Sequence, residues 1–331
     1  MVKREALERH QIAVYLVAIV LGIAAGLLGE PLGRGMQPLI SPLLAVLLYG
    51  MFTLIPFLKL REALANGRFM GALLLTNFVV VPLIVWGLLT LFPQTEAALI
   101  GVCLVLLTPC IDYVIVFTAL GKGDEKAITA ATPVLFVLQL ALLPLYLNLF
   151  AGKEAAALVE AGPFVEAFLT LIVLPLAAAV LTQLWAKHGE RAGQANRAGA
   201  RVLDAAAWLP VPAMALVLIA VTASQIGRIV SDPVPVLRVL PIYIGFLLLA
   251  PIAAALVGRL LKLEDGSGRA LIFSAFTRNS LVVLPLALAL PGEAAGAAAA
   301  VIVAQTLIEL LGELIYVRAV PGLLWRGKRG S

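Results

Sequence analysis

Charge is scarce in this chain of 331 residues. Charged residues make up 13% of it and hydrophobic residues 62%, whereas a soluble globular protein is about a quarter charged and about half apolar. The scarcity excludes an ordinary soluble fold. The formal net charge is only +5, and the basic residues are spread over the connections between apolar runs, so we expect no nucleic-acid partner.

Residues and motifs typical of catalysis are also rare. The chain has two cysteines, both inside apolar segments, which excludes a disulfide framework. Its two histidines, His10 and His188, fall at the edge of an apolar run or in a loop. There is no HExxH, Walker or serine–histidine pattern and no segment long enough for a soluble receptor domain. An enzyme or sensor is therefore disfavoured, and we expect no cofactor and no resident metal.

Long apolar runs dominate what remains. About 19 apolar residues cross the hydrocarbon layer as a helix, and only helices or closed barrels satisfy their backbone there. The runs lack the alternation of a barrel. The sequence therefore predicts an all-α polytopic membrane protein with ten transmembrane helices, at residues 11–30, 37–58, 69–93, 98–120, 127–151, 164–186, 205–227, 237–258, 269–290 and 294–317.

Lysine and arginine segregate between alternate connections. With the N-terminus in the cytoplasm, the outside connections carry only Arg34, Lys153 and Arg228. Arg238 falls near the end of a span and Arg278 within one. The positive-inside rule then places both termini in the cytoplasm. Short connections and the lack of a targeting extension favour a bacterial inner (plasma) membrane.

Ten spans divide into two sets of five, joined outside by residues 152–163. An odd number of spans per set predicts two inverted five-helix repeats. Weak echoes support this, such as Gln139 in the fifth span and Gln305 in the tenth. We expect residues 1–186 to hold the first repeat and the start of the second. Residues 187–203 form a cytoplasmic loop, and residues 204–331 hold the remaining spans and a basic tail.

The stretch LTPCIDYVIVF, in the fourth span, places proline, cysteine and aspartate within four positions. Proline removes a backbone donor and clashes with the preceding turn, so Pro109 predicts a helix break near the middle of the span. The ninth span is interrupted at a matching place, Thr277 to Asn279. Paired broken helices are the best sequence pointer to a transporter's binding site. The alternative is a proline kink without function.

Ionisable side chains inside a membrane usually mark a functional path. We hypothesise that Asp112 and Arg278, in the two breaks, form an ion pair where the broken spans cross. Otherwise each pairs elsewhere or reaches water. Gln305, Glu309 and Glu313 repeat every four residues and share one face of the tenth span, which predicts an inward face where a carboxylate exchanges a proton. Glu313 alternatively lies near the interface and is simply solvated.

A thiol in a helix break is a soft ligand, suited to soft metals and metalloids. Cys110 is the candidate for this role, whereas Cys103 is interpreted as a small hydrophobe. Polar groups near the breaks are candidate substrate contacts. They are Thr108, Pro109, Asn77, Asn279 and Ser280.

These residues resemble a known family. The stretch from Thr108 to Phe117, followed by Gly121-Lys122-Gly123-Asp124, resembles the fourth span of the arsenite-efflux permeases, the arsenical-resistance branch of the bile acid:sodium symporter superfamily. The stretches NFVVVPL from Asn77 and TLIE ending at Glu309 are similar to that branch's third-span and tenth-span motifs. The resemblance runs from the first span to the last.

The resemblance implies a core domain with two crossing broken helices, a panel domain, and export of the metalloid by proton-driven antiport. It also implies that Cys110 is needed for arsenite transport and that Glu309 lies on the translocation route. The chain departs from the pattern in the ninth span, where Leu281 falls in the place of a glutamate. Sodium-coupled members have sodium ligands at the positions of Ser274 and Arg278. A guanidinium there would repel sodium.

Two functions therefore compete. The first is a proton-coupled exporter of arsenite or antimonite that uses Cys110 and Glu309. The second is a sodium symporter-like carrier of small organic anions, in which the amides of the breaks and Arg278 attract a carboxylate or sulfonate. In either case we expect a small-molecule or metalloid substrate, protons or another coupling ion, surrounding lipid, and a monomer or homodimer.

Overall fold

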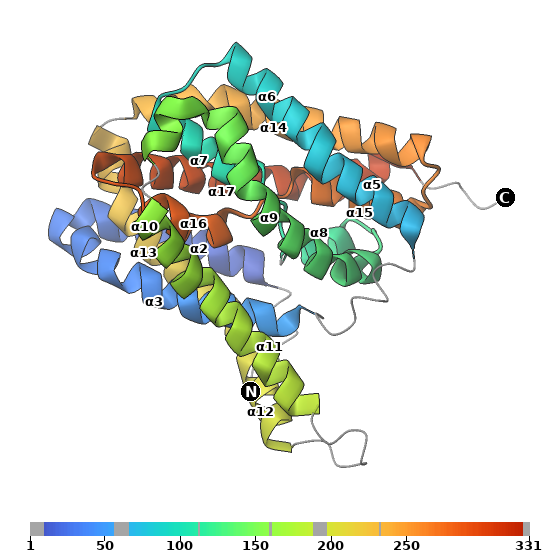
Figure 1. Ribbon diagram of the computed structural model, residues 1–331, viewed down its shortest axis with the longest axis horizontal. Coiled ribbons are helices and arrows are strands. Elements are labelled where there is room, and N and C mark those ends of the chain that lie inside the picture. The colour runs from blue at the N-terminus through green and yellow to red at the C-terminus, as the bar shows by residue number, and fades with distance from the viewer. Residues whose placement is uncertain are drawn as a thin grey trace. The chain divides into compact units, whose positions relative to one another are not determined.

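A computed structural model describes residues 10–55, 66–111, 113–158, 161–187, 197–231 and 233–326. Across these ranges the chain is helical and contains no sheet (Figure 1). One isolated antiparallel bridge joins Pro109 to Arg278. The predicted all-α class is therefore confirmed.

Seven helices in the described part of the chain are long and apolar enough to cross a membrane. They are Gly35–Leu54, Gly67–Leu91, Glu125–Phe150, Val165–Lys187, Pro210–Gly227, Val234–Leu260 and Glu293–Leu324. Three predicted spans have no counterpart among them. Residues 11–30 contain a shorter apolar helix, Ala13–Leu28, while the helices in residues 98–120 and 269–290 are broken. The chain is a multi-pass membrane protein.

The chain divides into two compact units. Unit 1 comprises Met1–Ile55, Glu160–Pro233 and Leu288–Leu290, and unit 2 comprises Pro56–Val159, Val234–Ala287 and Pro291–Ser331. Unit 1 contains α2 (Gln11–Leu28), α3 (Glu30–Leu54), α10 (Ala161–Phe168), the π-helix η3 (Leu169–Val173), α11 (Leu174–Lys187), α12 (Arg197–Ala206) and α13 (Pro210–Ser231). Helix α13 packs on both α2 and α3, and α3 also packs on α11.

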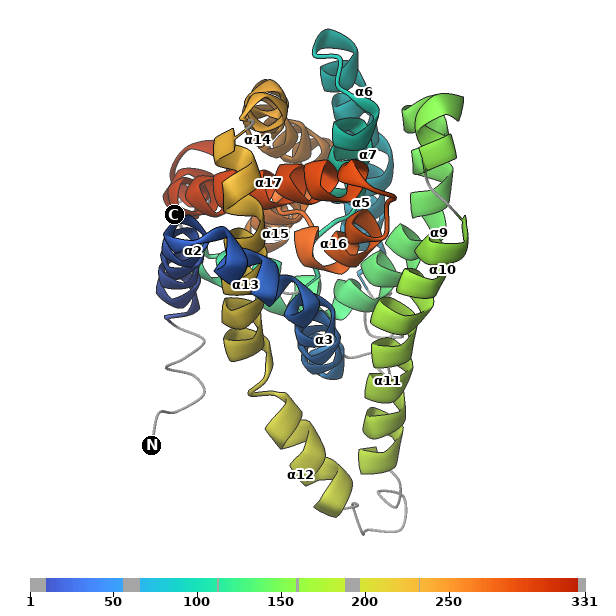
Figure 2. The same ribbon diagram turned by 90° about the vertical axis from the view of Figure 1, so that its left-hand side faces the viewer.

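Glycines bring the helices of unit 1 close together. A Cβ atom at Gly26 of α2 would lie 2.2 Å from Cγ2 of Ile226 and 2.5 Å from the carbonyl oxygen of Ala223, both in α13. Gly33 of α3 approaches the same carbonyl equally closely. Gly22 and Gly26 form a GxxxG pattern, which in membranes brings helix backbones into direct contact. Figure 2 shows α2, α3 and α13 of this unit.

Unit 2 holds the broken helices. Its elements are α5 (Gly67–Leu75), the π-helix η2 (Thr76–Val80), α6 (Val81–Leu91), α7 (Glu96–Leu106), α8 (Tyr113–Leu120), α9 (Glu125–Leu158), α14 (Val234–Leu260), α15 (Asp265–Phe276), α17 (Glu293–Ala319) and the π-helix η5 (Val320–Leu324), with most of α16 (Ser280–Leu288). Helix α17 packs along α7, and α14 packs along α15 (Figure 1). Helices α7 and α15 each end at one of the two breaks.

Trp325, directly after η5, packs against the ends of α14 and α15. Its indole N–H donates to Oδ1 of Asp265 at 3.0 Å. The ring lies so close to Gly268 that a Cβ there would be 2.4 Å from it, and a Cβ at Gly258 would be 2.9 Å away. Glycine at both positions therefore lets η5 pack against the turn between α14 and α15.

Candidate functional site

Both predicted helix breaks are confirmed. Helix α7 ends at Leu106 and α8 begins at Tyr113, with Pro109 between them. Helix α15 ends at Phe276 and α16 begins at Ser280. Proline cannot donate to the ladder of α7, which accounts for the first break. No proline lies in the second break. There the backbone N–H groups of Arg278 and Asn279 donate outside their own helix, to Glu309 and to the carbonyl of Thr108.

The two breaks cross and bond to each other. The amide N–H of Cys110 donates to the carbonyl oxygen of Thr277 at 3.1 Å, and the N–H of Asn279 donates to the carbonyl of Thr108 at 2.9 Å. These bonds flank the bridge between Pro109 and Arg278. Each break therefore satisfies part of the other's backbone, which unwound segments buried at membrane depth require.

The Arg278 side chain is fully buried at this crossing. Its Nη2 donates to Oδ1 of Asn77 at 2.8 Å, to the carbonyl of Ala275 at 2.6 Å and to the carbonyl of Ser274. Its Nη1 is 3.4 Å from the carbonyl oxygen of Leu106. The bonds that its guanidinium makes to described residues thus all go to oxygens without formal charge.

Neighbours fix the amide of Asn77 and cover the guanidinium. Asn77 Nδ2 donates to the carbonyl of Leu73 at 3.1 Å and to Oγ of Ser274 at 3.0 Å, which leaves Oδ1 to face the guanidinium. The guanidinium carbon of Arg278 also lies 5.5 Å from the centre of the Phe246 ring, a favourable cation–π distance.

Glu309 accepts hydrogen bonds from three directions. Its Oε1 accepts from the hydroxyl of Tyr113 at 2.7 Å. Its Oε2 accepts from the backbone N–H of Arg278 at 2.8 Å and from Nε2 of Gln305. The crevice beside it, lined in part by Tyr243 and Phe246, is too narrow for a water molecule. The carboxylate is thus held in a dry, donor-lined position at the second break.

The inward face of the tenth span is confirmed. Gln305, Glu309 and Glu313 are all at most 3% exposed. The alternative of a solvated Glu313 is therefore wrong, because this side chain is fully buried and accepts from the hydroxyl of Thr277. Its second oxygen, Oε2, is buried without a hydrogen-bond partner among the described residues.

The other predicted site residues have different surroundings. Cys110 is fully buried, and the hydroxyl of Thr108 bonds back to the carbonyl of Leu104 at 2.8 Å. Asn279 Nδ2 and Ser280 Oγ are buried atoms for which the described residues supply no hydrogen-bond partner. Asp112 lies outside the described residues, so its hypothesised pairing with Arg278 stays a prediction.

Sequence reasoning missed Tyr113, Thr277 and Phe246 as members of the site. Tyr113 bonds both Glu309 and the carbonyl of Arg278, the latter at 3.0 Å. Its position directly after the break was a usable signal, since a buried phenol needs a polar partner. Phe246 lies in an unbroken apolar span and carries no such signal.

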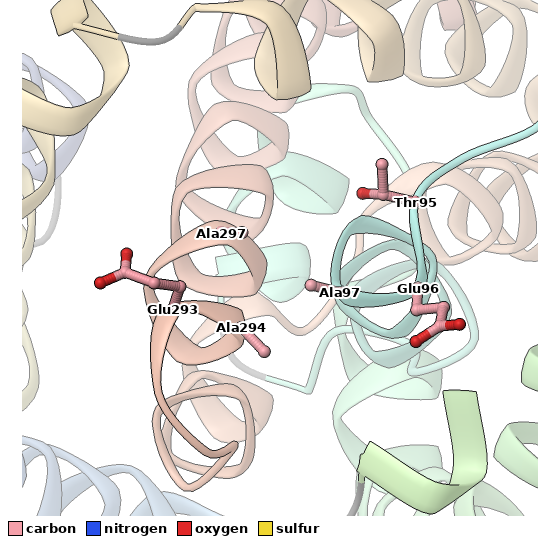
Figure 3. Close-up of a pocket in the computed structure, with 6 residues that line it drawn as sticks. All are labelled: Thr95, Glu96, Ala97, Glu293, Ala294 and Ala297. Carbon is pink, nitrogen blue, oxygen red and sulfur yellow. The ribbon is translucent and has the colours of Figure 1, made fainter. Parts of the chain in front are cut away.

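A shallow depression lies elsewhere in unit 2, at the first turns of α7 and α17. Its volume is about 520 Å³, and it is lined by Thr95, Glu96, Ala97, Glu293, Ala294 and Ala297. Figure 3 shows that Ala97 and Ala294 point into the gap while Glu293 points away from it. None of the predicted site residues lines it.

Broken helices that cross around buried charge are typical of membrane transporters. The chain belongs to the Sodium Bile acid symporter family, whose sequence profile matches residues 41–232. It is therefore a member of a transporter family rather than an enzyme. It is also similar to the arsenical-resistance protein Acr3 of Corynebacterium glutamicum. The two are 24% identical over 321 residues, which cover 92% of this chain and 83% of that protein.

Proposed function

We propose that this protein is a secondary active transporter that exports arsenite or antimonite in exchange for protons. One observation carries the proposal: the backbone N–H of Cys110 bonds to Thr277, so a soft thiol stands where the two broken helices cross. The similarity to a protein named for arsenical resistance supports the same substrate.

Each site residue then has a part in transport. Cys110 binds or selects the trivalent metalloid, with Thr108, Pro109, Asn279 and Ser280 around it in the breaks. Gln305 and Tyr113 hold Glu309, which exchanges the coupling proton beside them. The proton and the metalloid thus share one region of unit 2, where binding of one favours release of the other. Asp112, beside Cys110 in sequence, is part of the same proposal.

The ten-span arrangement belongs to this proposal. Two broken helices, one in each half of the sequence, support two inverted five-helix repeats. The division into unit 2, which holds both breaks, and unit 1, which holds none, supports a core domain and a panel domain. The distribution of lysine and arginine supports cytoplasmic termini in a bacterial plasma membrane. The transporter works as a monomer or a homodimer.

The buried state of Arg278 favours the metalloid over an organic anion. Transport of a carboxylate or sulfonate would use a guanidinium whose donors face the substrate. Here Nη2 donates to Asn77 and to two backbone carbonyls, and the side chain is fully buried. An anion would have to displace these oxygens before it reached the charge.

The test uses an arsenite-sensitive bacterial host that lacks its own exporter. Cells expressing the wild-type chain are expected to accumulate less arsenite than cells with an empty vector. Cys110→Ser is expected to express normally and to lose this effect, while the matched variant Cys103→Ser keeps it. A protonophore is expected to abolish export. Unchanged export by Cys110→Ser would remove the thiol from the mechanism, and sodium-dependent uptake of a labelled organic anion would favour the other carrier class.

A further inference from the structure

Three backbone carbonyls at the crossing have lost the donors that a continuous helix would supply. The carbonyls of Ser274 and Ala275 would accept from the N–H groups of Arg278 and Asn279. Those N–H groups instead donate to Glu309 and Thr108. In the same way, the N–H that would bond the carbonyl of Leu106 belongs to Cys110 and donates to Thr277.

These carbonyls come from the C-terminal ends of two helices. Leu106 is the last residue of α7, and Ser274 and Ala275 lie in the last turn of α15. A helix C-terminus carries partial negative charge and favours a cation. Helix ends that stop inside a transporter are known places for coordinating monovalent ions. Here both ends deliver their carbonyls to one guanidinium.

The remaining ligands also suit a cation of single charge. Asn77 Oδ1 adds a fourth oxygen, and the Phe246 ring presents its face to the same charge. All four oxygens are formally neutral, whereas sites for Mg²⁺ or Ca²⁺ normally include carboxylates. The oxygen set therefore matches Na⁺ or K⁺ better than a divalent ion.

We propose that the guanidinium of Arg278 is a tethered cation that permanently occupies an alkali-ion site formed by Asn77 Oδ1 and the carbonyls of Leu106, Ser274 and Ala275. The native protein consequently binds no dissociable Na⁺ or K⁺ there. Shortening the side chain to Arg278→Ala removes the charge and leaves the oxygens in place. An alkali ion then takes the vacated position and balances the buried carboxylate of Glu309.

The experiment measures the thermal unfolding of the purified full-length protein in detergent, without any transport substrate, so it is independent of the proposed arsenite activity. Each sample is titrated with NaCl or KCl against N-methyl-D-glucamine chloride at constant ionic strength. For Arg278→Ala we expect a saturable rise in melting temperature of roughly 2–4 °C or more with one of the alkali ions. The wild type and Arg278→Lys, which keep a tethered charge, are expected to show no ion-specific rise.

The double variant Arg278→Ala with Asn77→Ala tests the assignment of the ligands, because it removes one of the four oxygens. We expect it to lose most of the alkali-ion response. Recovery of folded Arg278→Ala only when Na⁺ or K⁺ is present during purification would support the proposal in the same way. Three results would overturn it: an alkali-specific rise in the wild type, a folded Arg278→Ala that does not respond, or an Arg278→Ala that folds in none of these media.

Discussion

The two units bury different kinds of groups. In unit 1, the polar side chains buried among the described residues are Gln11, Gln183, Thr222 and Gln225, and none of them is charged. Unit 2 buries Arg278, Glu309 and Glu313 together with a dense set of hydroxyls and amides. In unit 1, helices α2, α3 and α13 pack closely at glycine residues. In unit 2, the two breaks are held together by hydrogen bonds between their backbones.

This difference indicates a division of labour. Buried charges in a membrane cost several kcal/mol each and persist where function requires them. Unit 2 bears that cost and contains every predicted site residue that the structure describes. Unit 1 is stabilised by close contact between helix backbones, which packs its helices tightly without buried charges. The predictions below test whether the two units respond to substitution as this contrast requires.

The largest effect is expected from Arg278→Leu, compared with Gln183→Leu in unit 1. Leucine leaves four oxygens without a donor and Glu309 without a balancing charge, so we expect a loss of about 3–5 kcal/mol in unfolding free energy, or no folded protein. Gln183 donates to the carbonyls of Phe52, Thr53 and Ile55 at 2.8–3.2 Å, and its loss is expected to cost about 1–3 kcal/mol.

Thermal unfolding in detergent without alkali ions measures both variants. Equal losses would contradict the contrast between a charged unit and an uncharged one.

The next largest effect is expected from Glu309→Gln, compared with Glu313→Gln in the same helix, α17. Both oxygens of Glu309 accept hydrogen bonds. In Glu309→Gln the NH₂ group can donate to the Tyr113 hydroxyl, which then donates to the carbonyl of Arg278. The bonds from the Arg278 N–H and from Gln305 then go to a neutral oxygen and lose the strength that the carboxylate charge gives them. We expect a loss of about 3 kcal/mol in stability together with loss of transport. Glu313→Gln keeps an acceptor for Thr277 and changes an oxygen that has no partner among the described residues.

Glu313→Gln is therefore expected to change stability by less than about 1 kcal/mol. Melting temperatures of the two variants check the ranking, and a Glu309→Gln protein as stable as the wild type would show that its donors have other acceptors.

Sequence reasoning located the breaks because proline and charge inside an apolar run have few interpretations. Pro109 predicted the first break because proline cannot fit inside a regular helix. Arg278 pointed to the second because a charged side chain inside a membrane is energetically costly and usually functional. The spacing of Gln305, Glu309 and Glu313 likewise predicted their common buried face, since helical period is fixed.

The partners of Arg278 were beyond such reasoning. Its ligands at Leu106, Ser274 and Ala275 are backbone carbonyls, which every residue has and no sequence pattern distinguishes. They become available only because the N–H groups that a continuous helix would direct to them donate instead to the other break or to Glu309. Asn77, far away in the chain, was recognised as polar, but its contact with the guanidinium depends on tertiary packing.

A smaller effect should come from Tyr113→Phe, compared with Tyr243→Phe. The hydroxyl of Tyr113 bonds a carboxylate, and that of Tyr243 bonds the carbonyl of Val301 at 3.0 Å. Bonds to charged groups are worth about 1.5–3 kcal/mol and those between neutral groups about 0.5–1.5 kcal/mol. Tyr113→Phe should therefore lower stability more, and it should also slow transport because Glu309 loses a donor. Paired unfolding and arsenite-efflux assays test both points, and equal behaviour in both assays would remove Tyr113 from the site.

The smallest effect in this series uses the same methyl group at two positions of unit 1. In Gly26→Ala the new Cβ meets Ile226 and the backbone of Ala223, so α2 must move away from α13, at a cost of about 1–3 kcal/mol. In Gly35→Ala nothing lies within 4 Å of the new Cβ, and the better helix propensity of alanine gives a gain of up to about 1 kcal/mol. Opposite shifts in melting temperature are expected. Neither glycine carries a polar group, so the comparison isolates packing. A lower melting temperature for Gly26→Ala alone would show that close backbone contact stabilises unit 1. Equal changes in melting temperature for both variants would contradict the close packing that we use to distinguish unit 1 from unit 2.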